Sequence, residues 1–122
     1  MPSFGTLKAD TLTHSTAGSL ATNFVVEGSA KAWVFGTSAA ALTDSFNASS
    51  GTDNATGDYT YAFTSAMGSA NFVGECTAFG NVSKTGVQRV NTTSNVRINI
   101  ITTADGNASD NDNSTTVHGD LA

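Results

Sequence analysis

The sequence has few charged residues, and few of them are basic. Only 12% of its 122 residues are charged, five are basic, and the net charge is −5. The basic residues are scattered along the chain, at Lys8, Lys31, Lys84, Arg89 and Arg97. No basic patch is therefore available for phosphate groups, and we expect no nucleic acid among the partners of this protein.

Cysteine, proline and long apolar runs are also scarce. Cys76 is the only cysteine, which excludes an intrachain disulfide and agrees with folding in a reducing cytoplasm. We predict it to be a small buried residue of a strand rather than a reactive thiol. The N-terminus has neither a basic start nor an apolar stretch, and no run approaches the length of a membrane span, so neither secretion nor membrane insertion is expected.

The sequence is rich in residues that form short strands and turns. Ser, Thr, Asn and Gly are abundant, and they favour strands and turns over helices. Alternating apolar and polar residues predict strands over residues 7–13, 20–26, 30–35, 70–79, 87–91, 95–102 and 115–118. For a single domain, this pattern of short strands predicts an all-β fold, namely an antiparallel β-sandwich with a jelly-roll-like arrangement.

The clearest strand lies near the middle of the chain, where Tyr59, Tyr61 and Phe63 share one face. Residues 42–47 also alternate, and Gly and Asp residues between 51 and 58 supply turn chemistry. We therefore predict that these two segments form a β-hairpin with a long loop. The side chains predicted to fill the core or an intersubunit seam are Trp33, Phe46, Tyr59, Tyr61, Phe63, Phe72, Ile98 and Ile100.

Two strings of residues in this central region resemble a known family. KAWV at residues 31–34 and DSFNASSGTDNATGDYTYAFTSAM at residues 44–67 are similar to a repeated pattern in C-terminal domains of fibre-like structural proteins of tailed bacteriophages, especially marine and cyanobacterial ones. Residues 117–122 resemble the end of such domains, and residues 7–12 resemble a short opening segment. The family has a glycine-rich turn after the tryptophan strand, whereas this chain has GTSAAAL at residues 36–42, so that loop is expected to differ.

The resemblance implies a non-enzymatic structural protein on the surface of a virion, assembled in the host cytoplasm as a homotrimer. Two roles follow from it. The chain could decorate or cement the head, or form a short fibre, with capsid or tail proteins as partners. Alternatively, it could be the receptor-binding tip of a tail fibre, an adhesin for a host glycan or surface protein.

We divide the chain into an N-terminal arm and linker, residues 1–19, and a β-sandwich domain, residues 20–122. Residues 14–19 have the composition of a linker. Ahead of them, Phe4, Leu7 and Leu12 have little nearby to bury them, and they are the predicted partner-binding residues.

Candidate sites for chemistry are few. Asp105, Asp110 and Asp112 lie in an oxygen-rich segment, but the spacing lacks the central glycine and closing glutamate of an EF-hand. A solvated loop is the favoured interpretation and a calcium site the alternative, so no cofactor is predicted. No Gly-x-Ser-x-Gly motif supports a hydrolase, and a glycan-degrading enzyme or calcium-dependent lectin is the remaining hypothesis.

Overall fold

Strands are the main secondary structure in the computed structural model, which describes residues 9–16 and 18–122 and contains one short helix in that part of the chain. The described elements are β1 (Thr11–His14), β2 (Gly18–Ala21), α1 (Thr22–Gly28), β3 (Ala30–Gly36), β4 (Leu42–Phe46), β5 (Ala48–Ala55), β6 (Asp58–Phe63), β7 (Val73–Ala78), β8 (Lys84–Gln88), β9 (Asn95–Thr102) and β10 (Asn113–His118). Every strand pair is antiparallel. The predicted all-β, antiparallel class is therefore confirmed.

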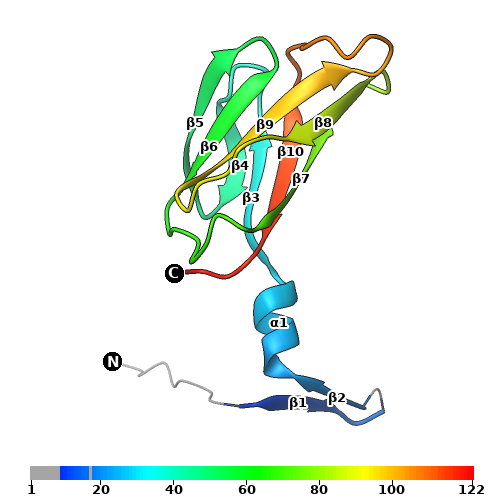
Figure 1. The fold of residues 1–122 in the computed structure, drawn as a ribbon. Helices are drawn as coiled ribbons and strands as arrows, with labels where there is room; N and C mark the ends of the chain where they lie inside the picture. The colour runs from blue at the N-terminus through cyan, green and yellow to red at the C-terminus, as the bar shows by residue number, and fades with distance from the viewer. Residues whose placement is uncertain (1–8, 17) are drawn as a thin grey trace.

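Residues 30–122, which we call the body, form two four-stranded sheets (Figure 1). The first, here the aromatic sheet, has the strand order β4-β3-β10-β7, and the second, the polar sheet, has the order β5-β6-β9-β8. Alternate residues of the central strands of both sheets are buried in a single hydrophobic cluster. Its largest members are Val34, Tyr59, Tyr61, Phe63, Met67, Phe72, Val96, Ile98, Ile100 and Val117.

Two buried tyrosines carry polar groups into this cluster. The Tyr61 hydroxyl donates to Asn113 Oδ1 at 2.9 Å. The Tyr59 hydroxyl accepts from the backbone N–H of Asn111 at 3.2 Å and lies 3.2 Å from the carbonyl oxygen of Ser38, to which it can donate. Burial raises the pKa of each phenol to about 12, so both stay protonated over the physiological range.

Trp33 and Phe46 do not lie in the core, which leaves the intersubunit seam as the place predicted for these two residues. They are cross-strand partners on β3 and β4 and lie on the outer face of the aromatic sheet. The alternating pattern identified which residues of β3 share a face, but the small Ala32 and Val34 point inward instead. The other six predicted core residues are buried, as expected.

The central hairpin is also paired differently from the prediction. β4 pairs with β3, while the partner of β6 is β5, a segment that the sequence predicted to be loop. One residue, Asn47, separates β4 from β5 and has a left-handed φ of 53°, which turns the chain from one sheet to the other. Its side chain holds this turn by donating to the Lys31 carbonyl at 3.0 Å and accepting from Ser65 N at 2.7 Å.

A helix occupies most of the segment predicted to be a strand at residues 20–26. Only its first two residues continue β2, and α1 begins at Thr22. Polar side-chain contacts stabilise its ends: Thr22 Oγ1 donates to the Ala9 carbonyl at 2.7 Å, and Lys31 Nζ donates to the carbonyl of Val26 near the C-terminus. A local pattern of apolar residues carries no sign of these contacts, which is why the strand prediction failed.

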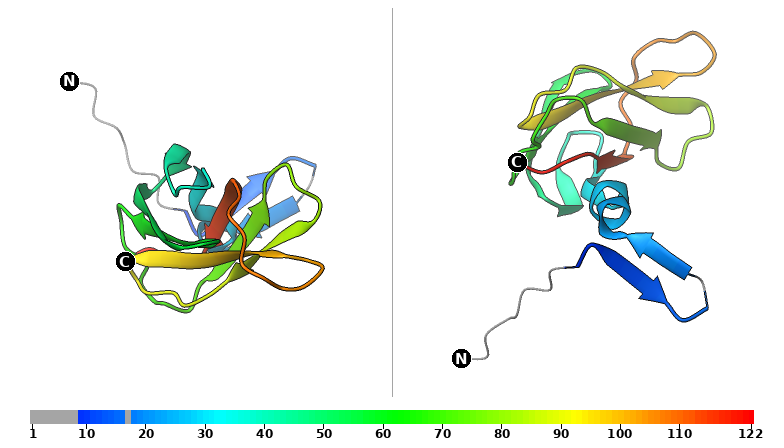
Figure 2. Two further views of the ribbon diagram at one scale, coloured as in Figure 1. Left: turned by 90° about the horizontal axis from the view of Figure 1, so that it is seen from above. Right: turned by 60° about the horizontal axis from the view of Figure 1, so that its bottom comes forward.

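The hairpin of β1 and β2 and the helix α1 lie outside the body, and α1 leads into the start of β3 (Figures 1 and 2). We call the described residues 9–16 and 18–29 the arm. The boundary predicted between residues 19 and 20 falls inside β2, and the two large sheets begin at Ala30.

Phe63 provides a test of the core. Its ring meets that of Phe72 edge to face, with centroids 5.6 Å apart. We expect Phe63→Ala to lower the free energy of unfolding by about 3–5 kcal/mol, because it leaves a cavity in close-packed surroundings. Denaturant unfolding measures this directly. Val82→Ala, at a fully exposed position, is the control and should change the value by less than about 0.5 kcal/mol. A loss below about 1 kcal/mol for Phe63→Ala would contradict this packing.

Candidate functional site

The acidic segment between β9 and β10 is the first candidate site, and its carboxylates bind the protein's own backbone. Asp110 Oδ1 accepts from Gly57 N at 2.6 Å, so it holds the turn between β5 and β6. Asp112 Oδ1 accepts from Ser38 N at 2.8 Å and holds the loop that follows β3. Two of the three candidate metal ligands therefore connect this segment to separate parts of the body.

The third, Asp105, is engaged within its own turn. Its carboxylate accepts from the backbone N–H of Asn107 at 3.0 Å and from its side-chain amide at 2.8 Å, and these bonds lower the pKa of the Asp105 carboxyl. Within residues 9–16 and 18–122, no group of three or more His, Cys, Asp or Glu side chains is placed to hold a metal ion. The favoured interpretation remains a polar loop that serves the fold.

Two variants separate a structural role for this segment from calcium binding. Asp110→Ala removes the acceptor for the buried Gly57 N–H, so we expect a loss of about 1–3 kcal/mol in the free energy of unfolding. Asp105→Ala, whose contacts stay within one exposed turn, should cost less. EDTA and added calcium should leave the melting temperature of the wild-type protein unchanged. A calcium-dependent rise in melting temperature that both variants abolish would show that the segment is a metal site.

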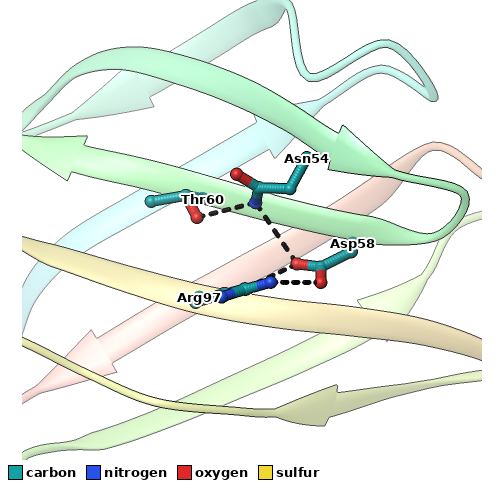
Figure 3. A network of polar contacts seen from close by, with 4 residues as sticks. All are labelled: Asn54, Asp58, Thr60 and Arg97. Atoms are coloured by element: carbon teal, nitrogen blue, oxygen red, sulfur yellow. Dashed lines mark hydrogen bonds and ion pairs between the residues drawn. The ribbon is translucent and has the colours of Figure 1, made fainter.

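A second polar cluster lies on the outer face of the polar sheet (Figure 3). The Asp58 carboxylate accepts from Arg97 Nε at 2.8 Å and from Nη2 at 2.6 Å, a bidentate ion pair. Asn54 Nδ2 donates to Asp58 Oδ1 at 3.2 Å and to Thr60 Oγ1 at 2.9 Å. These contacts tie the β5–β6 hairpin to β9, so all four side chains are used to fix strands relative to one another.

The ion pair makes stability depend on pH. Hydrogen bonds from Arg97 lower the pKa of Asp58 below its ordinary value of 3.8, so the pair stabilises the fold above about pH 4. This contribution is lost as the pH falls through the lowered pKa of the folded state. Since Arg97 is partly exposed, solvent screens the pair and the effect is modest.

We expect Asp58→Asn and Arg97→Gln each to lower the melting temperature at neutral pH and to flatten its decrease below about pH 4. Melting curves of the wild type, both single variants and the double variant, recorded over a range of pH, measure this. The double variant should lose less than the sum of the singles, because the two residues share one interaction. Additive losses, or a wild-type pH profile retained by both singles, would contradict the assignment.

The arm is the candidate attachment site. Leu12 on β1 and Leu20 on β2 are register partners, and both side chains are close to half exposed. Of the predicted partner-binding residues, Leu12 therefore lies on the arm, while Phe4 and Leu7 fall outside the described residues. Sequence analysis did not single out Leu20, although Leu12 and Leu20 lie on either side of a segment with turn composition, which is a signal for a hairpin pair.

Lys31 joins the arm to the body. Its side chain is buried, and its ammonium group donates to the carbonyl oxygens of Val26 and Ser29 and to Ser29 Oγ, the last two at 3.0 and 2.8 Å. A cation at this position also complements the negative end of the α1 dipole. His118 Nδ1 lies 3.3 Å from the Gly28 carbonyl oxygen and can donate to it from β10. Sequence analysis gave neither residue this role.

No protein-family model matches the chain, and neither curated proteins nor solved structures include a significant match. Among the described residues, the one helix is too short to cross a membrane.

Proposed function

We propose that this chain is a non-enzymatic structural protein on the surface of a tailed-bacteriophage virion, assembled in the host cytoplasm as a homotrimer. It decorates or cements the head or forms a short fibre, and its arm attaches it to another virion protein. The observation that carries the proposal is the arm itself, which presents Leu12 and Leu20 on one face, away from the core of the body. The residues shared with fibre-like phage proteins support the viral context.

The body acts in this proposal as a rigid β-sandwich. Both four-stranded sheets contribute to one hydrophobic cluster, which supports two packed layers. One Greek key that spans the two sheets supports a jelly-roll-like arrangement: β7, β8 and β9 follow one another as neighbours, and β10 returns beside β7.

Several ionisable side chains support a structural role for the body. Four of them hold strands, turns or the arm in place, namely Asp58, Arg97, Asp110 and Lys31. A protein of this kind stabilises a particle by adding buried apolar contacts between subunits.

Localisation on intact virions tests the proposal. Labelled antibody against this chain should mark the particle surface, and label confined to the tail tip would favour the receptor-binding alternative over head decoration. Absence of the chain from purified particles would reject a virion role altogether.

The attachment role of the arm has its own test. We expect the variant with Leu12→Ser and Leu20→Ser to bind at least about tenfold more weakly to particles lacking the native protein, because it removes apolar contacts from one face of the hairpin. Val82→Ser, which removes an equally exposed apolar side chain from the body, should bind like the wild type. Equal binding by all three proteins would place the attachment surface on the body.

A further inference from the structure

The two sheets of the body differ in what they present to solvent. Antiparallel sheets with one face in a core usually turn polar residues outward, and the polar sheet does so with Asp58, Thr60 and Arg97. Among its described large apolar side chains, only Val87 is exposed. The aromatic sheet presents Trp33, Phe46 and Val73 on its strands, and Phe79 directly after β7. The polar sheet therefore serves as an internal comparison and identifies the aromatic sheet as the unusual one.

The rings of the aromatic sheet lie close together. Register pairs Trp33 with Phe46 on adjacent strands. Phe35, on the same side of β3 as Trp33, meets Phe79 edge to face with centroids 4.8 Å apart. These contacts connect rings from three strands, β4, β3 and the end of β7, into one surface.

The helix α1, which leads into β3, has an exposed apolar surface of its own. Phe24, Val25 and Val26 are consecutive and exposed, so they cover about 200° of the helix circumference at 100° per residue. A helix apolar over so much of its surface is typical of a buried one. Only Ser29 separates α1 from β3, and Lys31 and His118 fix the helix at that end.

We infer that the outer face of the aromatic sheet and α1 together form the interface between copies of this chain. If copies meet along an axis beside β3, the helices that lead into β3 meet along the same axis. One association then buries the rings of the sheet and the apolar residues of α1 together. This inference gives a surface to the self-association in the proposed function, and it leaves the β1–β2 hairpin free for another virion protein.

The exposed apolar area is the amount that such an interface requires. The rings concerned are Phe24, Trp33, Phe46 and Phe79, exposed by 64%, 37%, 54% and 56%. At about 200 Å² per ring these fractions leave roughly 400 Å² of aromatic surface on each chain, to which three exposed valines add. A standard interface buries about 800 Å² per partner, of which about 60% is apolar. The match favours a second copy over a small ligand, which would cover only part of this surface.

Trp33 is the only tryptophan, so its fluorescence reports directly on this face. We expect the wild-type protein to be an oligomer by light scattering after gel filtration, with Trp33 shielded from acrylamide at high protein concentration and more accessible on dilution. The variant with Phe24→Ser and Phe46→Thr keeps this reporter, and threonine suits a strand. It should associate at least about tenfold more weakly and leave Trp33 accessible at both concentrations.

Val87→Thr, the matched change on the polar sheet, should remain oligomeric, and circular dichroism of all three proteins checks that each is folded. A monomeric wild type overturns the inference. If Trp33 of such a monomer is shielded only on virions, another protein covers this face, and the inference fails in that case too. If the double variant associates as strongly as the wild type, the copies meet through another surface. That result also overturns the inference, although self-association itself stands. A monomeric wild type would also remove the homotrimer from the proposed function, but neither result bears on whether label marks the virion, so the interface and the virion role fail separately.

Discussion

The need to satisfy buried tyrosine hydroxyls constrains much of this fold. Tyr59 and Tyr61 fill the space between the sheets, but each hydroxyl would cost free energy there without a partner. Apart from the Ser38 carbonyl, the partners come from residues 110–113, which places the start of β10 against the end of the core. Gly36 is required beside them, since a Cβ at that position would lie 2.1 Å from the Tyr61 oxygen. The acidic segment is thus positioned by the interior of the protein.

The same constraint explains why residues that resemble a metal loop do structural work. Asp110 lies 3.3 Å from the Tyr59 hydroxyl and also binds the backbone of the β5–β6 turn. That turn is tight, because a side chain at Gly57, whose φ is 65°, would meet the Ile100 carbonyl at 2.4 Å. Carboxylates that accept from backbone amides hold parts of the fold together, whether or not the segment also binds a cation. Composition alone does not distinguish these two uses of aspartate.

Sequence patterns predicted the faces of strands better than their partners. The alternation in β6 and β9 identified the buried sides correctly, because large apolar residues occupy one face of each strand and mainly polar residues the other. The partner of β4 was not predictable, since it depends on the backbone conformation of Asn47. Nor could alternation reveal that Trp33 points outward, because both faces of β3 are apolar. For the candidate site, the sequence indicated an apolar arm with Leu12, but the helix and its attachment through Lys31 depend on polar side-chain contacts that a pattern of apolar residues does not reveal.

The strings on which the proposed phage context rests coincide with the contacts that define the fold. Lys31, at the start of KAWV, caps α1, and Asn47, in DSFN, turns the chain between the sheets. Asn54 and Asp58, in TDNATGD, form the network with Arg97. A pattern of this kind identifies a scaffold, and its residues are committed to holding strands together.

Function must therefore reside where these contacts end, on surfaces that the scaffold presents. The arm illustrates this most clearly. A two-stranded hairpin and a seven-residue helix are each too small to be stable in water alone. Lys31 and His118 stabilise the end of α1 nearest the body, but the apolar residues of the helix and the hairpin gain nothing from them. In the proposed function, burial against other chains supplies the remaining free energy that orders the arm, so the stability of the arm and its proposed role depend on the same contacts.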